Sequence, residues 1–505
     1  MELVGRAVKN SGLVLLGESI SRLLVIISFF IITRYLGVEK FGQYSFIFAY
    51  LAFFCLLGDF GIDSIAIREI SRGNTPANIL LGNTIFLRLC LSLLGLFSAC
   101  ILIHILNYPP QLKTLVYLAS FTILFSYRYN SFRTIFDIPF QMNLRMFSPM
   151  LLKISSEVLF LAGIILTIWF DKGLAGIIIA RIITPLPGSL WLIVLSYRIL
   201  RPRFKLDPSL CRGVMKYSLP LALTLFIGLI LGRIDILILS QLSSDLEVGY
   251  YSAAVRLVEI LSIFPITMLI TVYPLMTSYY PHAPDKMQEV YEATFKYLFS
   301  FILPLTTIMI FYRQEIISLI FGRAYLPSSI VLPYLMGAIV FIFFNMIYNY
   351  ILVSANLQKY YLYATLLAAF FNVALNIALI PPLGFIGAGV AAMISQMIIF
   401  LYALSIPKTR TYALSASKAA SIPLLASLAL IPYLIFLPQN SLPFLFSLPL
   451  PYIIVTYLLG GITTREIDIL KSLLGRDRDS CPVSVTTNGL EQNFRSRFTD
   501  TDTPL

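Results

Sequence analysis

Long apolar runs separated by short polar links make up nearly the whole chain. Runs of 18 or more apolar residues recur from Leu13 onward, which is the length an α-helix needs to cross a bilayer. Strands of a membrane barrel would instead alternate polar and apolar residues in short pieces, so the pattern predicts helices. Cutting the sequence at Gly, Pro and charged clusters gives fourteen predicted spans: about 12–33, 42–64, 79–106, 113–132, 148–170, 173–197, 213–240, 247–275, 291–312, 328–354, 360–380, 384–406, 419–438 and 442–462.

Composition agrees with an all-α, polytopic membrane protein. Hydrophobic residues are 58% of the chain and charged residues 12%, where a soluble protein has about 25% charged residues; the mean hydropathy is +0.85. The first span follows Arg6 and Lys9 but is too long for a signal peptide and lacks a cleavage site, so we take it as a transmembrane helix. After Ile462 the chain becomes polar, and we expect a short amphipathic helix near Leu470 followed by disorder.

Two short motifs recur at nearly the same spacing. Phe41-Gly42-Gln43-Tyr44-Ser45 aligns with Val248-Gly249-Tyr250-Tyr251-Ser252 at an offset of 207, and Gly173-Leu174-Ala175-Gly176 aligns with Gly384-Phe385-Ile386-Gly387 at an offset of 211. Two such matches predict two copies of one membrane unit. We therefore expect two pseudo-symmetric six-helix bundles at 1–197 and 213–406, a basic linker at 198–216, two extra transmembrane helices at 407–462 and a cytoplasmic tail at 463–505.

The distribution of Lys and Arg predicts the orientation. With the N-terminus inside, the inner loops and both termini hold 25 of the 37 basic residues and the outer loops hold six. Because basic residues concentrate on the cytoplasmic side, we expect both termini in the cytoplasm of a multi-pass cell-membrane protein. The most basic segment, Arg198 to Lys216, either fixes this orientation or binds the headgroups of anionic membrane lipids.

The sequence indicates no metal site, cofactor or disulfide framework. The five cysteines form no CxxC pair, and His104 and His282 lie far apart. We also expect no nucleic-acid partner and no enzymatic activity.

Charged residues inside the predicted spans are the candidates for function, since each Arg or Lys at mid-membrane opposes insertion by about 2.5–3.5 kcal/mol. They are Glu18, Arg22, Arg88, Lys153, Glu157, Arg181, Arg233, Asp235, Arg256 and Glu259. Most of them must face a watered cavity, pair with another charge, or reach the interface. Lys153 lies near an inner end, from which it can reach the interface.

Arg22 and Arg256 lie near the middle of spans from different repeats, so both can reach one central chamber, as in transporters. A guanidinium donates two parallel hydrogen bonds to phosphate and stays charged at physiological pH. We predict that Arg22, Arg256 and Arg233 bind substrate. Glu18 is spaced to pair with Arg22, and Glu259 with Arg256, on the same helix faces. The alternative therefore stays open that each carboxylate only neutralises its arginine and that neither pair binds substrate.

Glu18, Glu259 and Asp235 are the predicted gating or ion-coupling residues. Asp235 cannot meet Arg233 at a spacing of two residues on a helix. Arg233 is therefore freer to contact a ligand or another helix.

Several motifs resemble the polysaccharide transporter family of oligosaccharide-lipid flippases. They are Arg34-x-Leu36-Gly37-x5-Gln43-Tyr44-Ser45, Asp59-Phe60-Gly61, Asp235, Gly249-x-Tyr251-Ser252-Ala253-Ala254, Phe321-Gly322-x-x-Tyr325, and the run Asn376 to Ala388 with Pro381, Gly384 and Gly387. The likeness covers about residues 5 to 405. It implies two six-helix bundles around a V-shaped cavity, plus two C-terminal helices, in the superfamily that also holds multidrug exporters and lipid II flippases.

The resemblance also implies a function. Such flippases turn a polyprenyl-diphosphate-linked oligosaccharide across the membrane by alternating access for surface polysaccharide biosynthesis, alongside polymerases and glycosyltransferases. Cationic residues on cavity helices receive the diphosphate; Arg22 and Arg256 occupy such helices, whereas Glu18 and Glu259 make this cavity less basic than the family pattern. Two alternatives stay open: an ion-coupled multidrug or small-molecule exporter of the same fold, and a membrane-embedded glycosyltransferase or polymerase, which the short predicted outer loops disfavour.

Overall fold

The computed structural model describes residues 2–126, 131–280, 282–436 and 449–461. Within these ranges every regular element is a helix, which confirms the all-α prediction. Among the described residues, eleven helical segments are long and apolar enough to cross a membrane, and the first of them, Leu16–Arg72, contains two sharp turns. The number fourteen stays a prediction. The predicted amphipathic helix near Leu470 and the cytoplasmic tail lie outside the described residues.

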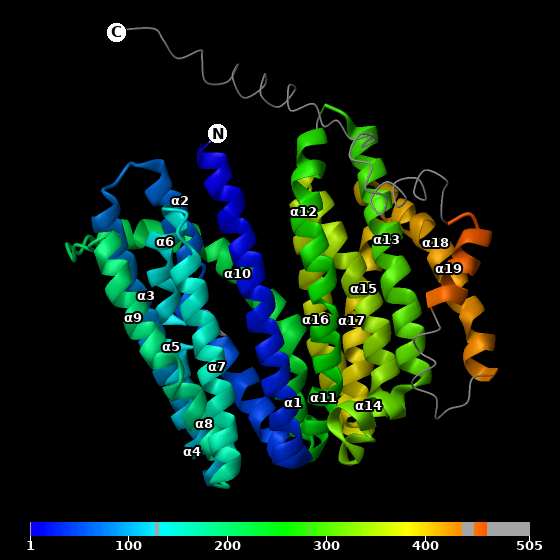
Figure 1. Ribbon diagram of the computed structural model, residues 1–505, viewed down its shortest axis with the longest axis horizontal. Coiled ribbons are helices and arrows are strands. Elements are labelled where there is room, and N and C mark those ends of the chain that lie inside the picture. The colour runs from blue at the N-terminus through cyan, green and yellow to red at the C-terminus, as the bar shows by residue number, and fades with distance from the viewer. Residues whose placement is uncertain (1, 127–130, 281, 437–448, 462–505) are drawn as a thin grey trace.

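The first half of the chain, α1 to α9, forms one side of the molecule (Figure 1). Its helices are α1 (Glu2–Asp59), α2 (Ile62–Arg72), α3 (Ala77–Ile105), α4 (Pro110–Ser120), α5 (Thr122–Phe125), η1 (Phe132–Asp137), α6 (Ile138–Met142), α7 (Phe147–Trp169), α8 (Gly173–Ile183) and α9 (Pro185–Ile199).

The second half, α10 to α17, forms the other side together with two further helices, α18 and α19. Its helices are α10 (Pro208–Leu242), α11 (Asp245–Leu261), α12 (Ile263–Tyr279), α13 (Pro284–Phe311), α14 (Arg313–Phe321), η2 (Arg323–Tyr325), α15 (Ser328–Ser354), α16 (Gln358–Leu383) and α17 (Phe385–Ser405), followed by α18 (Pro407–Phe436) and α19 (Pro449–Leu458). The domain boundaries predicted above are not fixed by this arrangement and stay a prediction.

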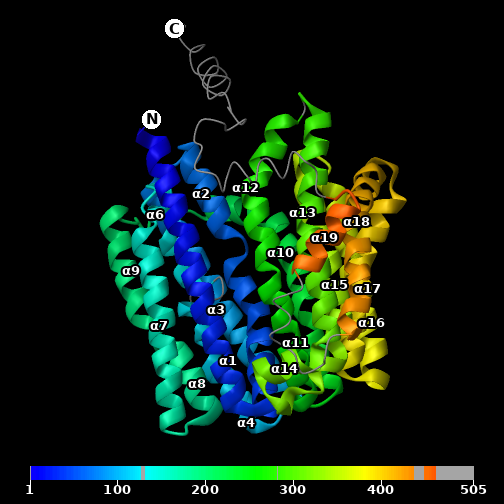
Figure 2. The ribbon, with the colours of Figure 1, turned by 45° about the vertical axis from the view of Figure 1, so that its right-hand side comes forward.

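The long helix α1 reverses direction at Gly37. This residue has φ 70° and ψ 177°, a conformation that is open to glycine and essentially closed to other residues. Phe29 and Phe41 meet across the turn with their ring centroids 5.3 Å apart. As a result, the segments before and after Gly37 run alongside each other and α2 lies near the N-terminal end of the molecule (Figures 1 and 2).

Several predicted spans are interrupted. The span predicted at 113–132 is not one helix, since α4 ends at Ser120 and η1 begins at Phe132 after the short α5. The span predicted at 247–275 changes from α11 to α12 at Ser262. Phe60 and Gly61 have positive φ values of 47° and 71° and end α1, so the predicted span 42–64 stops earlier than its hydrophobicity indicates.

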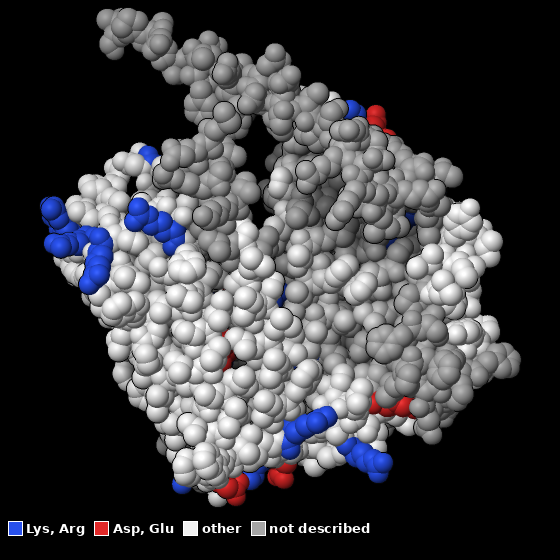
Figure 3. Space-filling view, viewed as in Figure 1, with Lys and Arg blue, Asp and Glu red and all other residues white. Residues whose placement is uncertain are grey.

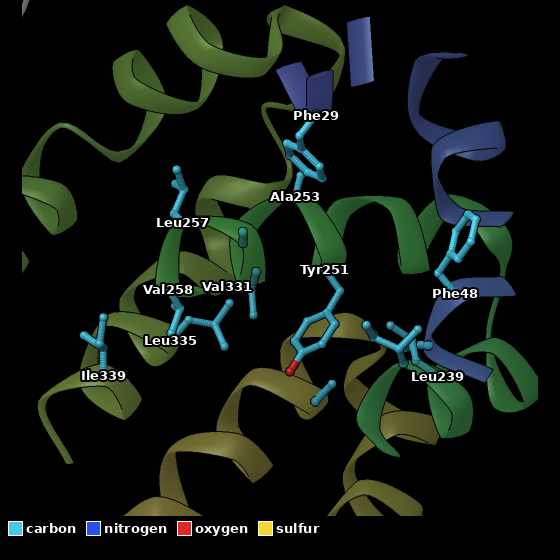
Figure 4. Packing of buried hydrophobic residues seen from close by; sticks show 14 of the residues in the cluster. Phe29, Phe48, Leu239, Tyr251, Ala253, Leu257, Val258, Val331, Leu335 and Ile339 are labelled. Atoms are coloured by element: carbon cyan, nitrogen blue, oxygen red, sulfur yellow. The ribbon is translucent and has the colours of Figure 1, made fainter. Parts of the chain in front are cut away.

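A core of buried apolar residues joins the two halves. One cluster runs from Phe29 in α1 to Ala416 in α18, and Figure 4 shows part of it around α11. There Leu257 and Val258 lie close to Val331, Leu335 and Ile339 of α15. Burying side chains of this kind excludes lipid from the helix contacts and holds α11 in a fixed position for the residues on its other face.

The linker before α10 is held by Asp207. Its carboxylate accepts hydrogen bonds from the backbone N–H and the hydroxyl of Ser209, at 2.8 and 2.7 Å, and so caps the helix N-terminus. The hydroxyl bond is the main cause that holds the pKa of Asp207 below its ordinary value. Asn83 of α3 reinforces the linker by accepting from the backbone N–H of Asp207 at 2.8 Å.

Candidate functional site

A cavity of about 440 Å³ lies between the two halves of the chain. Arg22 and Glu18 of α1 line it together with Arg233 of α10 and Arg256 and Glu259 of α11. The structure therefore brings together five of the six residues predicted from the sequence. Near the middle of the face in Figure 3, a few acidic and basic atoms are visible, recessed among uncharged residues.

Glu259 bridges two arginines on the wall formed by the second half. One of its carboxylate oxygens lies 2.6 Å from the guanidinium of Arg233, and the other is hydrogen-bonded to Arg256. The Arg256 guanidinium also lies over the ring of Phe29, 4.5 Å from its centroid, where the ring's electron-rich face attracts the cation. Arg256 is thus held between a carboxylate of its own helix and an aromatic ring from the other half.

A second charged group lies on the wall formed by the first half. Glu18 accepts from Lys153 of α7 at 2.5 Å and lies 3.9 Å from Arg22. From the sequence, Lys153 can reach the membrane interface; in the structure its ammonium is paired with Glu18 and lines the cavity. The reason is the position of α7 beside α1, which gives the ammonium a carboxylate partner within the protein.

Glu157 is a further cavity residue that had no assigned role. It is buried and lies 3.1 Å from Arg181 of α8, whose guanidinium lies 4.3 Å from the centroid of the Phe160 ring. The lining thus contains the four cations Arg22, Lys153, Arg233 and Arg256 and the three carboxylates Glu18, Glu157 and Glu259, so it carries a formal excess of one positive charge.

A smaller chamber of about 40 Å³ adjoins this group on the side toward Gly37. Ser45 and Ser252, which occupy equivalent positions in the two repeats, both line it. Ser252 is buried, and its hydroxyl has no hydrogen-bond partner among the described residues. Both serines belong to the repeated motif, but a single sequence does not show which helix faces meet, so it could not place them at a site.

At the repeat offset of 207, many residues that line the two cavities from the first half correspond to lining residues from the second half. Seven pairs of lining residues correspond: Arg22 with Leu229, Ile26 with Arg233, Phe29 with Ile236, Ser45 with Ser252, Phe48 with Val255, Ala49 with Arg256, and Ala52 with Glu259. The backbone positions are therefore related by an approximate two-fold axis, but the charges are not. The second half carries Arg233, Arg256 and Glu259 where the first half carries small or apolar residues.

Asp235 is the predicted residue that the structure places elsewhere. It is buried in α10, where it accepts hydrogen bonds from the Tyr251 hydroxyl and from the backbone N–H of Ile236, and it lines neither cavity described above. It lies two positions after Arg233, so on a helix the two side chains are rotated by about 200° from each other. A role for Asp235 in ion coupling stays a prediction.

Arg88 anchors a buried polar cluster in the first half. Its guanidinium donates to Asp59 at 2.9 Å and to Asp63, Thr134 and the carbonyl oxygen of Ser131. Arg88 is 0% exposed. The cost of burying the Arg88 charge is therefore offset by its carboxylate partners, and Arg88 does not line the cavity.

No group of three or more His, Cys, Asp or Glu side chains that could hold a metal ion occurs within the described ranges 2–126, 131–280, 282–436 and 449–461.

Solved structures with a similar fold belong to membrane transporters. The chain is similar to a lipid II flippase MurJ in an inward closed conformation, with a TM-score of 0.71 at 18% identity over 90% of this chain and 99% of that one. It is also similar to an inward-facing multidrug resistance MATE family transporter of the MOP superfamily, with a TM-score of 0.60 at 15% identity over 82% and 95% of the two chains. At these identities the likeness establishes the shared fold.

Sequence comparisons give the family. An uncharacterized membrane protein of Methanocaldococcus jannaschii is 26% identical over 199 residues, which are 38% of this chain and 39% of that protein. The MatE family matches residues 220–378. The polysaccharide biosynthesis protein family matches residues 7–280, more than half of the chain. The chain is therefore a multi-pass membrane protein that belongs to the polysaccharide biosynthesis protein family.

Proposed function

We propose that this protein is a flippase that moves a polyprenyl-diphosphate-linked oligosaccharide across the cell membrane by alternating access, for surface polysaccharide biosynthesis. The observation that carries the proposal is the convergence of Arg22, Arg233 and Arg256, from both halves of the chain, on one cavity inside a membrane protein. The fold shared with a lipid II flippase supports the same function.

The chemistry of the cavity fits a cargo that is anionic at one point and polar over much of its length. An unsatisfied hydroxyl in hydrocarbon costs about 4–8 kcal/mol, so a sugar chain needs a polar path through the membrane. Arg233 and Arg256 can donate paired hydrogen bonds to a phosphate once it displaces Glu259, which now holds both. The small excess of positive charge suits a phosphate group with a weakly charged glycan.

The proposal is tested by removing the arginine of each half. In the double variant Arg22→Ala, Arg256→Ala we expect loss of surface glycan, while the protein remains in the membrane and polyprenyl-linked glycan accumulates on the cytoplasmic leaflet. Arg72→Ala is the matched control, because Arg72 is half exposed and pairs with Glu69 away from the cavity. Normal surface glycan in the double variant contradicts the assignment of these arginines.

An ion-coupled exporter is the second candidate, favoured by the carboxylates in and near the site. Glu18 and Glu259 line the cavity, and Asp235 is buried in α10, where it is hydrogen-bonded to Tyr251 of α11. In this case deleting the gene makes cells more susceptible to cationic compounds, and Asp235→Asn has the same effect. Under the flippase proposal, susceptibility stays unchanged and lipid-linked glycan accumulates instead.

The orientation and the division into domains belong to the proposal as well. Lys and Arg side chains gather without acidic neighbours at the upper left of Figure 3, toward the end of the molecule where the N-terminus lies in Figure 1, whereas the lower edge carries both basic and acidic side chains. This supports a cytoplasmic N-terminus. With this orientation, the end of the cavity near Glu18 faces the cytoplasm, and the turn at Gly37 lies on the opposite side of the membrane.

A further inference from the structure

The two copies of the repeated glycine motif meet at the end of the molecule where the chain turns at Gly37. A Cβ atom on Gly42 would lie 1.8 Å from the carbonyl oxygen of Asp245, and one on Gly249 would lie 2.2 Å from the carbonyl oxygen of Val38. Carbon atoms cannot approach oxygen so closely, so neither position has room for a side chain. Glycines allow membrane helices to touch through their backbones in this way.

This contact is reciprocal. The offset of 207 that relates Gly42 to Gly249 also relates Val38 to Asp245. Each glycine therefore rests on the equivalent carbonyl of the other repeat, which is the pattern of a two-fold interface between identical surfaces. The approximate axis that relates the cavity walls passes between these two glycines.

The same axis continues into the small chamber. Ser45 and Ser252 lie three residues beyond the glycines, a rise of about 4.5 Å along each helix, and both line the chamber. Arg22, by contrast, precedes Gly37 by fifteen residues, or roughly 22 Å of helix. The glycine contact therefore lies at the closed end of the cavity, on the side toward Gly37.

Polar contacts between the two halves surround the glycines. Gln43 donates to Asp245 at 2.8 Å, the Tyr325 hydroxyl donates to the carbonyl oxygen of Thr33 at 3.0 Å, and Arg34 donates to the carbonyl oxygens of Leu319 and Ile320 at 2.6 and 3.3 Å. We call these contacts and the glycine contact the seam. The residues of the seam belong to the segment around the turn at Gly37 or lie in or next to α11, α14 and η2. The labels of α11 and α14 lie at the lower end of the molecule in Figures 1 and 2, where α1 makes its turn.

We propose that the seam is the gate of the transport cavity on the Gly37 side, and that it opens when the two glycine surfaces separate. This rests on the proposed function, since it takes the cavity to be a path for cargo. A backbone contact without side chains separates and closes again without repacking interlocked side chains. The hydrogen bonds around it join the two halves and so break together when the halves move apart.

The gate is tested by the access of a thiol reagent to the chamber. The full chain, with Cys55, Cys90, Cys100, Cys211 and Cys481 replaced by alanine and a single cysteine introduced as Ser45→Cys, is placed in lipid vesicles of known orientation. With both glycines present, we expect a membrane-impermeant maleimide to react rapidly from the N-terminal side and only slowly from the Gly37 side. Gly42→Ala with Gly249→Ala should raise the rate from the Gly37 side by about tenfold or more, by shifting the population toward the open seam.

The control separates opening of the seam from general loosening. A Cβ on Gly95 would lie 2.7 Å from the carbonyl oxygen of Phe54, a close contact between two helices of the same half. Gly95→Ala should therefore leave access from the Gly37 side unchanged. Unchanged access in the folded glycine double variant overturns the proposal, as does an equal increase in Gly95→Ala.

A second variant covers failure of the glycine variants to fold. Gln43→Cys with Asp245→Cys, in the same background, places two thiols across the seam for a short bifunctional cross-linker. Cross-linking should abolish transport of polyprenyl-linked glycan, and Tyr35→Cys with Asp171→Cys, whose native side chains are 3.1 Å apart within the first half, should not. Transport that survives complete cross-linking of the seam overturns the gate. Because the maleimide assay does not depend on cargo, a wrong choice of substrate leaves that result intact.

Discussion

At the scale of single residues, the charges inside this protein divide into two kinds. Arg88 and Arg181 are buried and paired within the first half. Arg22, Arg233 and Arg256 lie on a cavity, where their carboxylate partners can be exchanged for those of a ligand. A charged residue in a membrane helix therefore indicates a transport site only if its partner can leave.

The buried kind should govern stability. Arg88→Met leaves the carboxylates of Asp59 and Asp63 without their main cationic partner, and breaking a buried pair in this way costs about 3–5 kcal/mol. We expect a clearly lower unfolding temperature in detergent. Arg68→Ala is the control, since Arg68 is partly exposed and its pair with Glu69 contributes about 0–1 kcal/mol. Equal melting of the two variants would show that the Arg88 cluster does not hold the helices together.

At the scale of elements, the turn at Gly37 determines where the walls of the cavity lie. It returns the chain so that Phe29 lines the smaller chamber together with Ser45 and Ala49, and Arg22 lines the larger cavity together with Ala52. A helix that continued straight through this position would carry the second segment out of the molecule. One glycine thus converts a long apolar run into two walls.

Gly37→Ala should destabilise the protein. The Gly37 backbone conformation costs a residue with a Cβ about 1–3 kcal/mol, although a Cβ there has no neighbour within 4 Å. The loss should appear as a lower midpoint of unfolding. Gly213→Ala, also in open space but within α10, should instead be neutral or slightly stabilising. A Gly37 variant as stable as the Gly213 variant would contradict the requirement for a left-handed turn.

At the scale of the whole molecule, an approximately symmetric frame carries an asymmetric set of charges. Ile26 and Arg233 correspond under the repeat, and both line the larger cavity. If the cargo's phosphate lies near the axis, an arginine can reach it from either wall. An arginine at position 26 of the first half could then replace Arg233 of the second half.

Moving the charge gives a direct measurement. Arg233→Ile should weaken binding of a polyprenyl diphosphate in nanodiscs about 10–100-fold, the value of one charge-assisted hydrogen bond of about 1.5–3 kcal/mol. Adding Ile26→Arg should restore part of this affinity. Ile27→Arg is the control, because Ile27 is 46% exposed and does not line the cavity. Equal rescue by both would show that position on the axis is unimportant.

The sequence predicted the fold class, and five of its six candidate site residues lie together on one cavity, because bilayer thickness and the cost of buried charge constrain a single chain strongly. The roles of these residues stay a prediction. Sequence reasoning singled out Arg22 and Arg256 from their depth in two spans that belong to different repeats. The sequence could not show that Lys153 pairs with Glu18, which is 135 residues away, or that Asp235 faces away from the cavity. Both facts depend on which face each helix turns toward its neighbours. Apolar periodicity is weak in spans that are hydrophobic on every face, so this orientation is not encoded locally.

The reciprocal contact of Gly42 and Gly249 has a consequence for the ancestry of the chain. A surface that fits a copy of itself requires only one gene, so two separate subunits of the repeat could associate through the same glycine before fusion. Once they were joined, each copy could change independently. Charged residues could then arise at positions whose counterparts in the other copy stayed apolar, as at Arg22 opposite Leu229 and Arg233 opposite Ile26, an asymmetry that a homodimer cannot acquire.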